Sequence, residues 1–203
     1  MSHILHIDAS PRGERSISRT LTKEFISKWL QAHPQDTTTY RDVGQFPLPL
    51  LNEAWIAGAF SKASTLPPEL TEALRISDEL IDELLAADRY IFGIPMYNFS
   101  VPAHFKAYID QIVRVNRTFQ PPQEGLLTGK KMLVITTRGS SYAGGSELAS
   151  YDFHEPYLRT VFGYIGVTDM TFLYAERLNE GEDARQQSLM QVRRVMQQTV
   201  KTW

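Results

Sequence analysis

The sequence of 203 residues contains no cysteine. Disulfide bridges, thiol catalysis and cysteine-based zinc sites all need that side chain, so all three are excluded. A membrane-spanning helix needs roughly 20 consecutive apolar residues, and no run in the sequence approaches that length. An apolar strand pattern begins already at Ile4, which leaves no room for a signal peptide, and we therefore expect a cytoplasmic protein.

A strong charge of one sign is also missing. Lysine and arginine number 21 and aspartate and glutamate 23, so the formal net charge is −2. This balance argues against nucleic acid and an acidic membrane surface as partners. Neither familiar glycine-rich nucleotide motif, G-x-x-x-x-G-K-S/T or G-x-G-x-x-G, occurs. The histidines are scattered, with His3 and His6 on opposite faces of a predicted strand, so we predict no metal site.

Short apolar runs alternate with amphipathic segments along the whole chain. The predicted strands are Ile4–Ile7, Thr37–Val43, Tyr90–Ile94, Met132–Thr137 and Met170–Ala175. The predicted helices are one after Ser16 with Leu21, Phe25 and Trp29 on its apolar face, then Glu53–Phe60, Glu69–Ala87, a helix with Phe105 to Val113, Tyr151–Tyr164 and Glu182–Lys201. This alternation predicts a single α/β domain over residues 1–203, an open parallel five-stranded sheet of flavodoxin-like order 2-1-3-4-5 with helices on both faces.

Ligands of such sheets bind beyond the carboxyl ends of the strands, at the switch point between the first and third strands in sequence. The sequence places three unusual loops at that edge, Ala9–Ser18, Pro95–Val101 and Thr137–Tyr142. The first loop joins a strand to a helix N-terminus, where free main-chain N–H groups favour anions. The hydroxyls of Ser10, Ser16 and Ser18 add donors for a phosphate. Serines in this position are also ordinary helix caps, so the loop alone leaves both interpretations open.

The other two loops carry groups that suit a flat ring. Tyr97, Asn98 and Phe99 offer two aromatic rings and an amide, and Thr137 and the residues after it offer a hydroxyl and a glycine. A phosphate at one end and a flat ring at the other describe FMN. Aromatic residues in loops are also common as hydrophobic plugs, so this observation needs independent support.

The chain resembles a known family, the bacterial FMN-dependent azoreductases and NADH:quinone reductases. The resemblance extends over essentially the whole chain and rests on the segments Ala9-Ser10, Ser16-Ile17-Ser18, Pro95-Met96-Tyr97-Asn98-Phe99, Gly125-Leu126, Thr128-Gly129-Lys130-Lys131, Thr137-Arg138-Gly139 and Gly163-Tyr164-Ile165-Gly166. It implies a homodimer with one tightly bound FMN per subunit. It also implies two-electron transfer from NADH or NADPH to quinones and azo compounds, with reductive cleavage of the azo bond.

The resemblance also implies the roles of individual residues. The FMN phosphate would be held by Ser10, Ser16, Ile17 and Ser18, and the flavin ring by Met96, Tyr97, Asn98 and Phe99, with Thr137, Arg138, Gly139 and Ser140 along its pyrimidine side. Phe119 and Phe172 would wall a substrate pocket across the dimer, next to Tyr142. The flavin N5 carries the chemistry, so no side chain is expected to act as a catalytic acid or base. Because both substrates must reach one open flavin face, we expect a ping-pong mechanism.

Two features distinguish this chain from some members of the family. Tyr142 stands where some of them have a histidine, and no arginine occurs near Ser61, where some have one in the pocket. The segment from Gly44 to Pro68 is long for a connection and bears Trp55, Ile56 and Phe60, so we expect it at a dimer interface. A flavodoxin-type electron carrier is the alternative function, and a sensory flavin module a third. Carriers are usually strongly acidic, which this chain is not.

Overall fold

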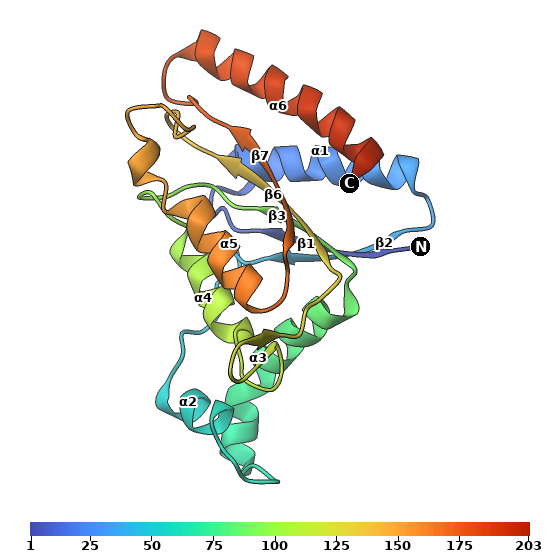
Figure 1. The fold of residues 1–203 in the computed structure, drawn as a ribbon, viewed down its shortest axis with the longest axis vertical. Helices are drawn as coiled ribbons and strands as arrows, with labels where there is room; N and C mark the ends of the chain where they lie inside the picture. Colours follow the sequence, from blue (N-terminus) through green and yellow to red (C-terminus); the bar gives the residue numbers. More distant parts are fainter.

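Five parallel strands form the centre of the computed structural model, which describes every residue from Met1 to Trp203. The strands are β1 (His3–Asp8), β2 (Thr37–Asp42), β3 (Arg89–Gly93), β6 (Lys131–Thr137) and β7 (Asp169–Ala175). They lie in the order β2-β1-β3-β6-β7 (Figure 1). The predicted flavodoxin-like order is therefore confirmed, and no strand end differs from its predicted position by more than one residue.

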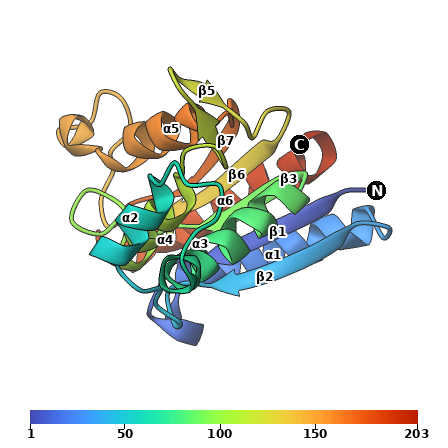
Figure 2. The ribbon, with the colours of Figure 1, turned by 90° about the horizontal axis from the view of Figure 1, so that it is seen from below.

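Helices cover both faces of the sheet, as predicted. They are α1 (Ile17–Ala32), α2 (Glu53–Ala59), α3 (Pro68–Ala86), α4 (Ala103–Ile112), α5 (His154–Tyr164) and α6 (Glu182–Thr202). One face carries α1 and α6, and the other carries α3, α4 and α5 (Figure 1, Figure 2). None of the helices combines the length and apolar composition that crossing a bilayer requires.

The strands show why the chain forms two cores. In β3, Tyr90 and Phe92 pack into the core under α3, α4 and α5, whereas Ile91 points into the core under α1 and α6. A central parallel strand is buried on both faces, so it reads as a continuous apolar run. The edge strand β2 is polar by contrast, and its Thr37 and Thr38 are exposed.

The first helix begins and packs where the sequence predicts. Ser16 has an extended backbone, and its Oγ accepts a hydrogen bond from the N–H of Arg19 at 3.4 Å, so it is the N-cap of α1. Leu21, Phe25 and Trp29 are all buried on one face of the helix. This start fixes the helix N-terminus directly beyond the loop that follows β1.

Two expectations about local structure were wrong. The fourth long helix begins at His154 and not at Tyr151, because Oδ1 of Asp152 accepts hydrogen bonds from the N–H groups of His154 and Glu155 and so caps it there. The segment expected to be a plain loop after α4 contains a short antiparallel pair, β4 (Phe119–Gln120) and β5 (Glu124–Gly125). Strands of two residues are too short to give a period-two pattern.

The long segment between β2 and α3 folds back onto the molecule through Trp55. The indole is buried, and its Nε1 donates to Oε1 of Gln111 in α4 at 2.9 Å. Trp55 therefore is not part of an exposed apolar surface, contrary to expectation. Four other large side chains of the segment are at least half exposed, and we call them the excursion patch: Phe46, Leu50, Ile56 and Phe60.

Candidate functional site

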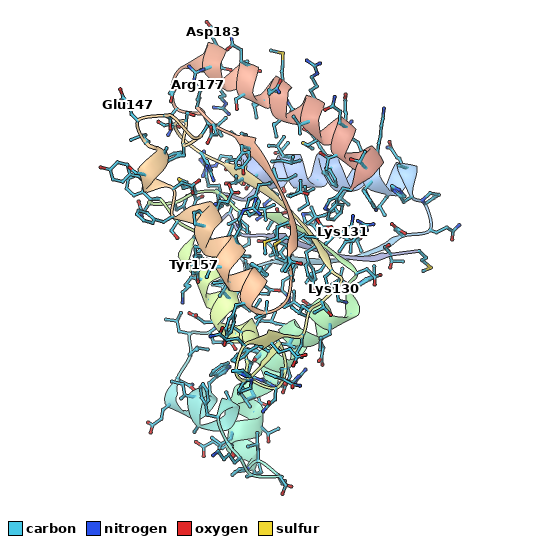
Figure 3. The ribbon with its side chains drawn as sticks, in the orientation of Figure 1. Lys130, Lys131, Glu147, Tyr157, Arg177 and Asp183 are labelled. Atoms are coloured by element: carbon cyan, nitrogen blue, oxygen red, sulfur yellow. The ribbon has the colours of Figure 1, made fainter.

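A cavity of about 310 Å³ lies at the carboxyl ends of β1, β3, β6 and β7. Figure 3 shows this end of the sheet beside Arg177, whereas Lys130 and Lys131 mark the opposite end. The cavity is lined by Ser10, Arg12, Ser16, Ile17, Pro95, Met96, Tyr97, Thr137, Arg138, Gly139, Leu178, Asn179 and Arg185. Residues from all three predicted loops therefore meet in one hollow. No carboxylate or imidazole lines it, so its charged lining is cationic.

The end of the cavity nearest α1 presents hydrogen-bond donors. The main-chain N–H groups of Ser10, Ile17 and Ser18 donate to no group of the protein. The hydroxyls of Ser16 and Ser18 lie 3.1 Å apart, and that of Ser10 lies 3.5 Å from the hydroxyl of Tyr97. Ser18 itself is buried behind Ser16 and does not line the cavity. Free donors at a helix N-terminus form an anion site.

The loop after β3 forms a tight turn whose conformation is costly. Tyr97 and Ser100 exchange main-chain hydrogen bonds of 2.9 and 3.1 Å. Between them, Asn98 and Phe99 have φ angles of 48° and 70°, a left-handed conformation that residues other than glycine seldom adopt. Strain of this kind persists where the surrounding structure enforces it, often at functional sites. The N–H groups of Asn98 and Phe99 have no partner in the protein, but of this turn only Tyr97 lines the cavity, and Asn98 and Phe99 do not.

The loop after β6 lines the cavity without adding a net positive charge, because its arginine is paired with carboxylates. Arg138 is only 2% exposed, and its Nη1 lies 2.9 Å from Asp152 and 3.2 Å from Glu176. The charge of its guanidinium is therefore neutralised by these two carboxylates, even though Arg138 is among the residues that line the cavity. At Gly139 an added Cβ would lie 2.7 Å from Nδ2 of Asn179, so a side chain there would displace Asn179. Ser140, which we expected along the cofactor, does not line the cavity.

The three predicted substrate residues do not line this cavity within one chain. Tyr142 lines a neighbouring hollow of about 670 Å³, and its ring lies 6.4 Å from that of Phe99. Phe119 lies in the β4–β5 hairpin and packs against Tyr164. Phe172 is 8% exposed on β7, with the guanidinium of Arg159 4.5 Å above its ring.

Sequence reasoning missed the cavity residues that come from the segment after β7. Leu178 and Asn179 follow the end of that strand, and Arg185 lies in the first turns of α6. The predicted parallel sheet contained the signal that would have found them, because all carboxyl ends of parallel strands meet at one edge. No motif in these residues indicated a ligand.

Comparisons with known proteins show the family to which the chain belongs. A family model described as a flavodoxin-like fold matches residues 2–200. The FMN-dependent NADH:quinone oxidoreductase of Nostoc punctiforme is 58% identical over 206 residues, which cover 100% of both chains. The FMN-dependent NADH:quinone oxidoreductase 1 of Trichormus variabilis is 60% identical over 203 residues, 98% of this chain and 96% of that protein.

Solved structures give the same picture. The crystal structure of an azoreductase from Bacillus anthracis superposes with a TM-score of 0.90 at 27% identity, covering 100% of both chains. An FMN-dependent NADH-azoreductase from the same species, solved in complex with FMN, has a TM-score of 0.84 at 21% identity and supports the fold. It covers 98% of this chain and 99% of that one.

One buried group beside the site predicts how stability depends on pH. Burial and the nearby guanidinium of Arg138 lower the pKa of His154 from 6.5 to about 3. Between these values the unfolded chain binds a proton that the folded chain does not, so stability falls as the pH falls. Each pH unit costs about 1.4 kcal/mol. Between pH 6 and 4.5 the wild-type protein should lose about 2 kcal/mol more than His154→Leu in urea unfolding. Equal losses in the two proteins would refute the assignment.

Proposed function

The chain belongs to the family of flavodoxin-like proteins, and from this membership and the cavity described above we propose that it is an FMN-dependent oxidoreductase. It transfers two electrons from NADH to quinones, and to azo compounds whose bond it cleaves. The observation that carries the proposal is a single cavity with free phosphate donors at one end, lined also by Tyr97, which opens a strained turn whose next two N–H groups have no partner in the protein. The relatives at 58% and 60% identity are FMN-dependent NADH:quinone oxidoreductases, and this supports NADH as the donor and quinones as the acceptor class.

The donor set fits the FMN phosphate. A phosphate dianion needs several hydrogen-bond donors and no nearby carboxylate, and the cavity lining satisfies both conditions. The N–H groups of Ser10, Ile17 and Ser18 and the hydroxyls of Ser10 and Ser16 would hold it. Ser18 contributes its N–H, and its hydroxyl supports Ser16.

The remaining walls fit a flat heterocycle. Met96, Tyr97, Thr137 and Gly139 line the cavity beyond the phosphate end. The N–H groups of Asn98 and Phe99, in the turn that Tyr97 opens, have no partner and would hold the polar edge of the ring. When bound, FMN would supply hydride acceptance at N5 and two-electron transfer to the second substrate. The protein would bind and orient the cofactor, and we assign no side chain as a proton donor or base.

The second substrate needs a wall that one chain does not provide. We assign this wall to a homodimer in which the excursion patch lies at the interface and Phe119 and Phe172 approach the cavity of the other subunit. The patch supports this assignment because Phe46, Leu50 and Phe60 are 74%, 78% and 67% exposed, a costly arrangement for an isolated chain. Tyr142 and Phe99 complete a pocket of stacking rings, which discriminates poorly between planar substrates.

The same pocket orders the reaction. NADH and the acceptor are both planar and both must reach the one open flavin face, so they bind in turn.

A cytoplasmic location suits an NADH-dependent enzyme without cysteine, since proteins of a reducing compartment seldom contain disulfides.

The phosphate site is tested by Ser16→Asp. Aspartate is as good an N-cap as serine, so α1 keeps its start, but a carboxylate now faces the phosphate. FMN affinity, measured by quenching of flavin fluorescence, should fall by at least about 100-fold, equivalent to about 2.7 kcal/mol. Ser16→Asn, an equally good but neutral cap, is the matched control and should lose far less. Unchanged affinity in the aspartate variant would place the phosphate elsewhere.

The reaction is tested by anaerobic spectroscopy and initial rates. The yellow absorbance of the FMN-loaded protein should bleach within seconds of adding NADH and return on adding a quinone. Double-reciprocal plots at several fixed quinone concentrations should give parallel lines because the substrates alternate in one pocket. Intersecting lines would contradict the single pocket, and a flavin that NADH leaves oxidised would contradict the enzyme assignment in favour of a carrier.

The quaternary structure is tested by light scattering at micromolar protein. The wild-type mass should be twice the chain mass of 23.2 kDa. Phe60→Asp places a charge in the excursion patch and should weaken the dimer, because a buried unpaired charge is costly. Met190→Asp, a similarly exposed apolar position on α6, should not. A fully active wild-type monomer would rule out the shared site.

A further inference from the structure

Two carbonyl oxygens in the loop after β1 accept hydrogen bonds from side chains that do not line the cavity. Nη2 of Arg19 donates to the carbonyl oxygen of Ser10 at 2.9 Å, and Nε2 of Gln45 donates to that of Pro11 at 2.6 Å. Carbonyl oxygens carry partial negative charge and would repel a phosphate if they faced it. The conformation of this loop therefore depends on groups outside the cavity.

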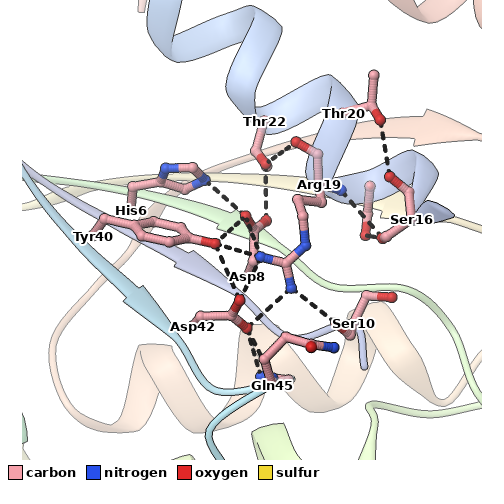
Figure 4. Close-up of polar contacts among 12 residues, drawn as sticks. His6, Asp8, Ser10, Ser16, Arg19, Thr20, Thr22, Tyr40, Asp42 and Gln45 are labelled. Carbon is pink, nitrogen blue, oxygen red and sulfur yellow. Dashed lines mark hydrogen bonds and ion pairs between the residues drawn. The ribbon is translucent and has the colours of Figure 1, made fainter. Parts of the chain in front are cut away.

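Arg19 is held in place by a network that Figure 4 shows in full. Its guanidinium makes a two-pronged contact with Asp42 at the end of β2, at 2.6 and 3.0 Å, and also contacts the hydroxyl of Tyr40. Asp8 lies 3.6 Å away and adds a second carboxylate. Burial opposes ionisation of Asp42, but the hydrogen bond from Arg19 holds its pKa below the ordinary value, so the pair stays charged.

The carboxylate of Asp42 also holds the turn that follows β2. Oδ1 of Asp42 accepts hydrogen bonds from the N–H groups of Gly44 and Gln45 at 3.1 and 2.9 Å, and so places the Gln45 side chain against Pro11. The backbone at Gly44 lies so close to the loop that an added Cβ would sit 2.3 Å from the carbonyl oxygen of Ser10. The Asp42 carboxylate therefore positions both side chains that donate to these carbonyl oxygens. It binds Arg19 directly, and it orders the turn that carries Gln45.

We propose that Arg19 and Asp42 are a positioning pair for the cofactor phosphate, which holds the carbonyl oxygens of the loop away from the phosphate so that only donors face it. The proposal rests on the proposed FMN function. Arg19 is not a phosphate ligand, because it does not line the cofactor cavity and opens instead onto a separate hollow with His6 and Lys23. Its effect on the cofactor passes through the main chain of Ser10.

The variant Asp42→Asn distinguishes a positioning role of the pair from a direct effect of the Asp42 charge on the phosphate. If only charge mattered, removing a carboxylate near a dianion would strengthen FMN binding. If the pair positions the loop, the neutral amide holds Arg19 less firmly, and FMN binding weakens. Asparagine can still accept from Gly44 and Gln45, so the turn after β2 keeps its main hydrogen bonds.

The experiment measures the dissociation constants of FMN and of riboflavin, which lacks the phosphate, for the full-length apoprotein. Arg19→Gln and Asp42→Asn should weaken FMN binding by roughly 10- to 100-fold, the effect of losing a charge-assisted hydrogen bond. Riboflavin binding should change less than about threefold, within the effect of an ordinary surface substitution. Arg19→Lys should resemble Arg19→Gln, because a lysine cannot contact Asp42 and the Ser10 carbonyl in a fixed fork.

A matched control and distinct outcomes complete the test. Arg193→Gln removes a comparable two-pronged pair with Glu24, away from the site, and should leave both constants unchanged. Equal or tighter FMN binding by Asp42→Asn, or equal losses for FMN and riboflavin, would overturn the positioning role while leaving the proposed function intact. A wild-type protein that binds neither flavin would overturn the proposed function and this inference with it.

Discussion

The position of β1 between β2 and β3 is the constraint on which the site depends. Both neighbours are parallel to it, so the chain leaves β1 in one direction to reach β2 and later returns on the other side to form β3. The connections diverge at the carboxyl end of β1 and leave a crevice there. Every loop that lines the cavity begins at this edge of the sheet, including the segment after β7 that no motif indicated.

The hydrogen-bond donors available in the crevice are mainly main-chain N–H groups that have no partner within the fold. The first N–H groups of any helix lack intrahelical acceptors, so placing the start of α1 in the crevice supplies donors without any special side chain. The left-handed turn at Asn98 and Phe99, which follows the cavity residue Tyr97, leaves another pair of N–H groups without partners. The proposed site is therefore built mainly from backbone geometry, and the bound flavin would carry the chemistry.

The sequence was informative where a pattern is local and repeated. Strand order, the cap at Ser16 and the three loops followed from periodicity, helix chemistry and the rules of parallel sheets. It was uninformative where a side chain's partner is distant in the chain. The burial of Trp55 against Gln111 and the enclosure of Arg138 by Asp152 and Glu176 arise from tertiary contacts alone. Residue type and spacing did not distinguish a buried arginine from a solvated one.

Both ends of the cavity are backed by the same arrangement, an arginine between two carboxylates, which is half-buried at Arg19 and buried at Arg138. Arg19 lies with Asp8 and Asp42 behind the phosphate loop, and Arg138 lies with Asp152 and Glu176 behind the loop after β6. Buried ion pairs contribute little net stability, because the cost of removing charges from water offsets their attraction. Their directional hydrogen bonds nevertheless permit few alternative loop conformations. Placed behind a site made of backbone donors, such pairs fix the direction of N–H and carbonyl groups, and that direction decides whether an anion binds.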